Sequence, residues 1–257
     1  MLAALNSGSL RTFGDRMKLT VRVEDIMTPR RLLKHAVDDA EAQATADQKG
    51  FDAVPILGQD GSVREFWSRA DRKRMRITRQ HRIPHDSTVE RLLPALGAHV
   101  VQFVYYRSEM VGLIDASDLN KPLGRMAWLH PMVELERAIL DAVRDRKVDD
   151  KRQADALGNQ AAHTQGRQAK AQRHDLEMPL LEYAQFQALL DAAIYLKIIQ
   201  LSEQEIIELN EFRKRAAHGA RPTVIDDRSD CARLTRALKV ARAAAQSAAR
   251  LSALRGR

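Results

Sequence analysis

Two stretches decide the fold: FDAVPILGQDGSVREFWSRAD at residues 51–71 and AHVVQFVYYRSEMVGLIDASD at residues 98–118. Each begins with a β-branched, aromatic-rich run, passes through a polar turn into a second apolar run, and ends on an aspartate. A helix-like stretch precedes each one, DDAEAQATADQKG in the first case and STVERLLPALGAH in the second. Ser87 is a candidate N-cap, and Gly50 and Gly97 lie near the predicted C-terminal ends. The order helix–strand–turn–strand therefore recurs at a spacing of roughly 45–50 residues, which predicts an internal duplication.

The composition is that of a globular protein without disulfides. The chain has 257 residues, of which 44% are hydrophobic and 5% aromatic, enough for one large domain or two ordinary ones. Cys231 is the single cysteine, which excludes an intramolecular disulfide and a cysteine-based zinc cluster and suits a reducing cytoplasm. Because no run of about 18 apolar residues occurs, no membrane partner is expected. Residues 1–18 lack the features of a secretory signal and are expected to form a flexible tail, with Met17 as an alternative start.

The charge is basic, with 42 Lys and Arg against 34 Asp and Glu and a net charge of +8. Between Arg228 and Arg257 there are eight basic residues and one acid, Asp230. Such a skew is typical of proteins that bind a polyanion, nucleic acid first, and equally of a solvated helix.

The first part of the chain resembles a tandem pair of cystathionine β-synthase (CBS) domains, also called a Bateman module. Besides the duplicated units, VEDIMTPR at Val23 to Arg30 is similar to the entry segment of such domains. The resemblance covers about 100 residues and implies an α+β fold over residues 19–124. It also implies an adenine nucleotide (AMP, ADP or ATP) as a regulatory ligand.

The phrase that contacts the nucleotide in this family runs glycine, two apolar residues, Thr or Ser, two further residues, and aspartate. The second repeat has Gly112, Asp115 and Asp118 at these positions, and the first has Glu65, Ser68 and Asp71. By resemblance, the candidate nucleotide-binding residues are Ser68, Asp71, Gly112, Asp115 and Asp118. Each repeat departs once: Asp115 would repel a phosphate, and Glu65 replaces a glycine that allows close approach of the backbone. Alternatively, Asp71 and Asp118 are ordinary acids at helix N-termini.

From residue 125 to residue 257 the pattern is helical. Leu135, Ile139 and Val143 recur at i, i+4 and i+8 in a first helix, in which Pro131 is expected to lie in the first turn. Further helices are expected in LLEYAQFQALLDAAIYLK, SEQEIIELNEFRKRAAHG and CARLTRALKVARAAAQSAARLSAL, which makes four and predicts an all-α bundle.

A polar segment at about 147–174 interrupts this bundle. It is rich in Gln, Ala and charge, so we expect a mobile insertion or a weak polar helix with little to bury. His163 and His174 lie in it without partners at metal-ligand spacing, so no metal site is expected.

The third predicted helix carries the candidate catalytic residues. Ser202 and Glu205 form a capping box at its start. Arg213 lies about 40° from Leu209, at the edge of the apolar face, so its guanidinium needs a partner. Glu136 on the first helix is a sensible carboxylate for that role.

The phrase ELNEFRKRAAHG at residues 208–219 and the four-helix layout resemble the HEPN domains (higher eukaryotes and prokaryotes nucleotide-binding). Catalytic members are metal-independent endoribonucleases whose Arg and His meet between two protomers. The resemblance implies that Arg213 holds the scissile phosphate and that His218 moves a proton during attack by the ribose 2′-hydroxyl. It departs at Lys214, where the family has a polar residue such as Asn, and Arg215 is a rival for the arginine role.

Three functions therefore follow from the sequence. The first is a nucleotide-sensing CBS pair that regulates an endoribonuclease domain acting on RNA, as a homodimer that needs no cofactor for catalysis. The second is a non-catalytic regulator or dimerisation protein, in which the helices dock a partner. The third is RNA binding without cleavage.

Overall fold

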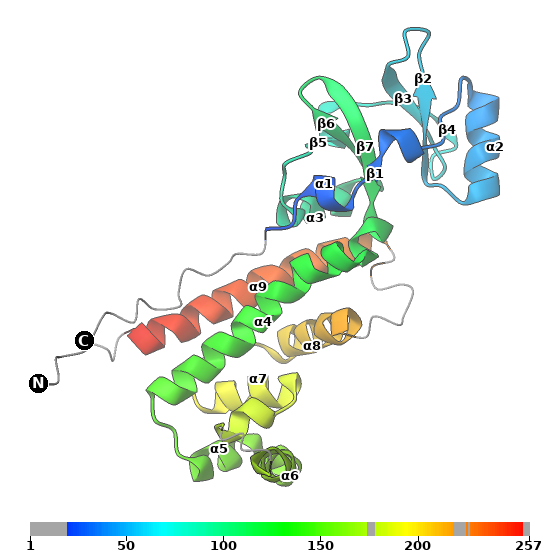
Figure 1. The fold of residues 1–257 in the computed structure, drawn as a ribbon. Coiled ribbons are helices and arrows are strands. Elements are labelled where there is room, and N and C mark those ends of the chain that lie inside the picture. The colour runs from blue at the N-terminus through cyan, green and yellow to red at the C-terminus, as the bar shows by residue number, and fades with distance from the viewer. Residues whose placement is uncertain (1–19, 174–177, 218–224, 226, 254–257) are drawn as a thin grey trace, which may run out of the picture.

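The computed structural model describes residues 20–173, 178–217, 225 and 227–253. Two small sheets occupy one end of the molecule and helices the other (Figure 1). Within the described residues no strand follows β7 (Glu109–Asp115), so the predicted change from α+β to helix is confirmed. The expectations for residues 1–18, Met17 included, lie outside the described part of the chain.

Both predicted units are present as a helix followed by an antiparallel hairpin. The first consists of α2 (Asp39–Lys49), β2 (Ala53–Leu57) and β3 (Val63–Ser68), and β4 (Lys73–Arg76) completes the sheet order β2-β3-β4. The second consists of α3 (Val89–Ala98), β6 (Val101–Tyr106) and β7. Its sheet has the order β1-β7-β6-β5, with β1 (Thr28–Pro29) antiparallel to β7 and β5 (Arg82–Pro84) parallel to β6.

The predicted ends of α2 and α3 are partly correct. Gly50 ends α2 in the left-handed conformation, with φ of 71°, as expected of a C-cap glycine. Ser87 is not the N-cap of α3; Thr88 takes that position, and Ser87 is buried one residue earlier. Gly97 lies inside the last turn of α3, where Ala232 of α9 packs against it.

The helical part contains six α-helices among the described residues rather than the four expected. These are α4 (Pro122–Asp145), α5 (Asp150–Leu157), α6 (Ala161–Gln172), α7 (Phe186–Tyr195), α8 (Glu203–Ala217) and α9 (Arg228–Ala253). The remaining short elements are α1 (Val23–Ile26) and the 3₁₀ turns η1 (Arg30–Leu32), η2 (Arg79–His81), η3 (Ala116–Asn120), η4 (Gly158–Gln160) and η5 (Leu180–Tyr183). None of the described helices is both long and apolar enough to cross a membrane.

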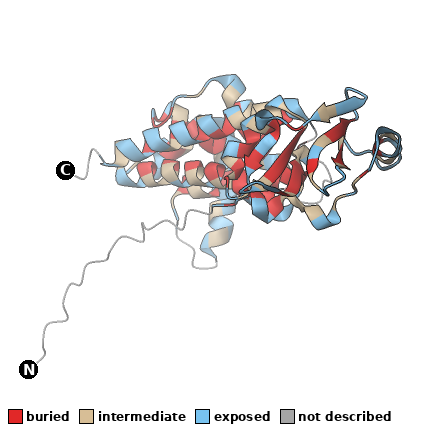
Figure 2. Cartoon of the chain, turned by 90° about the horizontal axis from the view of Figure 1, so that it is seen from above, coloured by how far each residue is buried: buried red, intermediate tan, exposed pale blue. Residues whose placement is uncertain are grey.

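The core is continuous from the second β unit into the helices. The long helices α4 and α9 lie side by side, and α3 packs on α9 (Figure 1). The three predicted positions of α4, Leu135, Ile139 and Val143, are all buried in this core. Pro131 is not in the first turn, because α4 begins at Pro122, and it is buried within the helix. In Figure 2 the buried residues follow the inner faces of the helices and continue into the strands.

The polar segment at 147–174 is helical, which was one of the two alternatives expected, and it buries more than its composition predicts. It forms α5 and α6, and the side chain of Gln153 is buried. The Gln153 amide donates to the Val148 carbonyl at 2.7 Å and accepts from the Leu181 N–H at 3.1 Å, which ties α5 to η5. His163 is exposed, and His174 lies outside the described residues. No cluster of three or more His, Cys, Asp or Glu in the described ranges is placed to hold a metal ion.

Candidate ligand cleft and the arginine site of α8

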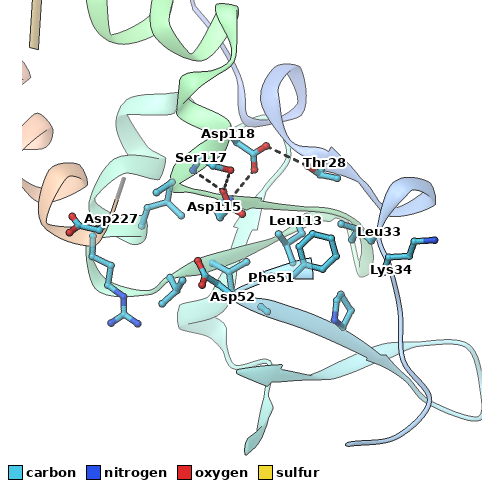
Figure 3. Close-up of a pocket in the computed structure, with 18 of the residues that line it drawn as sticks. Thr28, Leu33, Lys34, Phe51, Asp52, Leu113, Asp115, Ser117, Asp118 and Asp227 are labelled. Carbon is cyan, nitrogen blue, oxygen red and sulfur yellow. Dashed lines mark hydrogen bonds between the residues drawn. The ribbon is translucent and has the colours of Figure 1, made fainter. Parts of the chain in front are cut away.

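A cleft of about 800 Å³ lies where the two β units meet the start of α9 (Figure 3). One wall comes from the chain between α2 and β2, a second from the end of β7 and from η3, and a third from the first residues of α9. The lining residues used below are Thr28, Lys34, Phe51, Asp52, Asp115, Ser117, Asp118, Asp227, Arg228 and Ser229. Segments far apart in the sequence therefore build one site.

The acidic turn after β7 is held from several sides. Asp118 is only 4% exposed, and its carboxylate accepts from the Asp115 N–H at 2.9 Å. The Lys121 ammonium lies 2.6 Å from the same carboxylate, and the Thr28 hydroxyl donates to it at 3.4 Å. Burial raises the pKa of Asp118 and the charge of Asp115 adds to this, while Lys121 opposes both. The turn is therefore a preformed wall of the cleft.

Asp115 and Asp52 bring negative charge to the cleft from two different elements. The Asp115 carboxylate accepts from the Ser117 N–H at 2.8 Å and from the Ser117 hydroxyl at 2.6 Å. Burial raises the pKa of Asp52, and the charge of Asp115 raises it further, while Arg69 and Arg228 act in the opposite direction. The two carboxylates therefore repel each other across the cleft.

Three of the five candidate nucleotide-binding residues do not line the cleft. Gly112 lies behind it, where an added Cβ would come within 2.7 Å of both the Met27 sulfur and the Thr28 carbonyl oxygen. Its role is to let β1 approach β7. Ser68 and Asp71 hydrogen-bond to each other at 2.6 Å, away from the cleft. Of the predicted set, the structure brings Asp115 and Asp118 to the cleft.

The sequence prediction missed Phe51, Asp52, Asp227 and Arg228. Phe51 lines the cleft and is 41% exposed. Its position directly after Gly50, the glycine that ends α2, is the sequence feature that could have indicated an exposed aromatic residue. Arg228 reaches the cleft from α9, and no local pattern could have placed it beside Asp52.

The predicted partnership between Arg213 and Glu136 is confirmed. The Arg213 Nε donates to the Glu136 carboxylate at 2.8 Å, and its guanidinium lies 5.3 Å from the centre of the Phe186 ring. The Arg213 side chain nevertheless keeps 35% of its surface exposed. A guanidinium oriented by a carboxylate and still open to solvent can bind a phosphate. His218, the proposed catalytic partner, lies outside the described residues.

Arg215 and Lys214 have different surroundings. Arg215 pairs with Glu211 on its own helix and with Asp230 of α9, at 3.2 Å in the second case. Arg233 of α9 pairs with Glu211 and Asp230 as well, at 2.5 Å and 3.5 Å. Arg215 therefore belongs to a network that joins α8 to α9, whereas Lys214 is exposed.

Comparison with protein families and with curated proteins finds no match. Among solved structures, the chain is similar to the crystal structure of an uncharacterized conserved protein from Pyrococcus horikoshii. The similarity has a TM-score of 0.33 and 19% sequence identity, and it covers 40% of this chain and 92% of the other. A likeness of this size carries no argument about fold or function.

Proposed function

We propose that the protein is a ligand-responsive regulator whose cleft binds an adenine nucleoside or nucleotide. The resemblance to tandem CBS domains supports this ligand class. The observation that carries the proposal is that Asp115 and Asp118, which stand at the nucleotide-contacting positions of the second repeat, line a cleft of about 800 Å³. Small-molecule sites in proteins commonly have volumes of about 300–1,000 Å³ and a mixed apolar and polar lining.

The chemistry of the walls suits the two halves of a nucleoside. Phe51 offers exposed aromatic surface on which a base can stack. The carboxylates of Asp115 and Asp118 can accept hydrogen bonds from ribose hydroxyls. Because Asp115 repels a phosphate, we expect any phosphate to lie toward Lys34 or Arg228, the basic residues among the lining residues described.

Calorimetric titration of the full chain with adenosine, AMP, ADP and ATP tests this proposal. Phe51→Ala is expected to weaken binding about tenfold, because stacking of a base on an aromatic ring contributes about 1–3 kcal/mol. Tyr195→Ala is the matched control, since Tyr195 is an exposed aromatic residue on α7 that does not line the cleft. Equal affinity in the wild type and the Phe51 variant, or no binding of any of the four compounds, would contradict the proposal.

A metal-independent endoribonuclease of the HEPN type is the second candidate function. The orientation of the exposed Arg213 guanidinium by Glu136 favours it. In this proposal Arg213 binds the scissile phosphate and His218 transfers the proton, in a site assembled by a homodimer. The ligand cleft would then regulate the cleavage of RNA.

Incubation of labelled RNA with the protein in EDTA tests this activity. Arg213→Ala and His218→Ala should each abolish cleavage, while Arg236→Ala, at an exposed arginine of α9, should not. Cleavage that survives both substitutions would exclude the site. Salt-sensitive RNA binding without cleavage would instead favour the binding-only function, and neither cleavage nor binding would favour a non-catalytic regulator.

A further inference from the structure

Asn120, the last residue of η3, joins the acidic turn of the cleft to Ile225, three positions before the start of α9. Its side-chain amide donates to the Ile225 carbonyl at 3.0 Å, and its side-chain oxygen accepts from the Ile225 N–H at 2.9 Å. The two residues are 105 positions apart in the sequence. Together the two hydrogen bonds fix the position and the orientation of the Ile225 backbone. We call this pair of hydrogen bonds the Asn120 clamp.

The residue held by the clamp is an anchor point of the fold. The Ile225 side chain is 1% exposed and belongs to the large core shared by α3, α4, α8 and α9. Because its side chain is fixed in the core and its backbone is fixed by Asn120, Ile225 cannot shift without disturbing η3. A buried pair of backbone groups left without partners would carry a substantial free-energy cost.

The cleft is built from both sides of the clamp. Asp115, Ser117 and Asp118 precede Asn120 within a few residues, and Arg228 and Ser229 follow Ile225 within a few residues. A ligand that fills the cleft therefore contacts the two segments that the clamp joins. Its binding is expected to depend on their relative position.

The first turns of α9 in turn hold α8. Asp230 pairs with Arg215, and Arg233 pairs with Glu211 and Glu208 of α8. The same helix α8 carries Arg213 two positions before Arg215. A chain of contacts therefore runs from the cleft through η3, the Asn120 clamp and α9 to α8, the helix that carries Arg213.

We propose that Asn120 is the positioning residue that sets the α9 wall of the cleft and couples occupancy of the cleft to the first turns of α9. The proposal rests on the proposed ligand-binding function for its physiological role, although the clamp itself can be tested without a ligand. Coupling of this kind is reciprocal. If ligand binding stabilises one position of α9, a substitution that shifts α9 away from that position must lower the affinity for the ligand.

Hydrogen–deuterium exchange of the full-length protein, read for residues 227–234, is the test with ligand. AMP and adenosine are the probes, and in the wild type either one that binds is expected to slow exchange in this segment. Asn120→Ala is expected to raise ligand-free exchange there about tenfold, the size expected for losing a buried hydrogen-bonded pair. It should also remove the protection by ligand while binding to the cleft remains measurable.

A double-mutant cycle tests the clamp without ligand. Asp118→Asn loosens the acidic turn, because the carboxylate accepts from the Asp115 N–H and pairs with Lys121. The expected result is faster exchange in residues 227–234 when Asn120 is present and no additional effect in the Asn120→Ala background. An equal effect of Asp118→Asn in both backgrounds would overturn the proposal.

Two controls separate coupling from simple loss of stability. Asn210→Ala removes a buried amide of α8 that donates to Gln187 at 2.9 Å, and it should leave the response to Asp118→Asn intact. Asn120→Asp retains the acceptor for the Ile225 N–H and should give an intermediate response if Asn120→Ala does not fold. If adenosine, AMP, ADP and ATP all failed to bind, the proposed nucleotide-binding function would be wrong. The double-mutant cycle would still decide whether Asn120 couples the acidic turn of the cleft to α9.

Discussion

Replacement of Gly112 by alanine should distort the cleft from behind. The new Cβ would lie 2.7 Å from the Thr28 carbonyl oxygen and 2.7 Å from the Met27 sulfur. Cβ atoms in proteins essentially never lie within 3.0 Å of a heavy atom that is not bonded to their own residue or its neighbours. The methionine side chain can move, but the carbonyl belongs to the backbone of β1, which pairs with β7 directly at Gly112. The strand must therefore shift, and overpacking of this kind costs about 1–3 kcal/mol of unfolding free energy.

Gly166→Ala is the matched control for this prediction. Gly166 lies inside α6, and no atom beyond the neighbouring backbone of its own helix comes within 4 Å of an added Cβ. Alanine is therefore expected to stabilise the protein by about 0.5–1 kcal/mol. The two substitutions add the same methyl group and should change stability in opposite directions. Urea denaturation followed by circular dichroism at 222 nm measures both.

The Gly112 variant should also bind ligand more weakly, because Thr28 lines the cleft and hydrogen-bonds to Asp118. If Gly112→Ala were as stable as the wild type, close approach of β1 could not be the reason for the glycine. Loss of binding with unchanged stability would instead return Gly112 to the role that the sequence motif implied, direct contact with the nucleotide.

Three further predictions concern other parts of the molecule. Asp52 is exposed, but partial desolvation by the cleft and the charge of Asp115 raise its pKa against the opposing effect of Arg69 and Arg228. Asp52→Asn should therefore raise the urea midpoint slightly at pH 7, and this gain should disappear below the ordinary pKa of 3.8. Cys231 is fully buried and burial raises its pKa to about 12, so a thiol reagent at pH 8 should label it only upon unfolding; rapid labelling of the native protein would contradict this packing. Gln153→Ala should cost about 1–3 kcal/mol, because the buried Leu181 N–H and the half-buried Val148 carbonyl lose their partner. The substitution Gln204→Ala, at an exposed residue, should change the denaturation midpoint little.

Local patterns predicted the two helix–hairpin units, the helices α4, α7, α8 and α9, and one tertiary contact. Hydrophobic periodicity placed Leu135, Ile139 and Val143 in the core because a helix face depends only on neighbours three or four residues away. The same angular argument put Arg213 at the edge of a face, where it needed a carboxylate, and Glu136 supplies it. The capping box was correct too: the Ser202 N–H and hydroxyl both donate to Glu205 at 2.8 Å.

The misses share a dependence on long-range contacts. Composition marked residues 147–174 as polar, yet Gln153 is buried because a carbonyl and an N–H of other segments satisfy its amide. Pro131 lies in mid-helix because α4 starts at Pro122, earlier than its apolar repeat indicates. The clamp between Asn120 and Ile225 joins residues that no local rule relates, so the third wall of the cleft could not be predicted from the sequence.

Because one hydrophobic core extends from α3 into α4 and α9, the protein should not fold as two separate expression fragments. Gly97 abuts Ala232, and Leu92 and Trp128 are buried in the same cluster as Leu234. An expression fragment that stops near residue 124 would present the apolar side of α3 to water and should aggregate. Conversely, a fragment that begins there would lose the surface on which α9 rests, so thermal melting of the whole chain should not resolve the second β unit from the long helices.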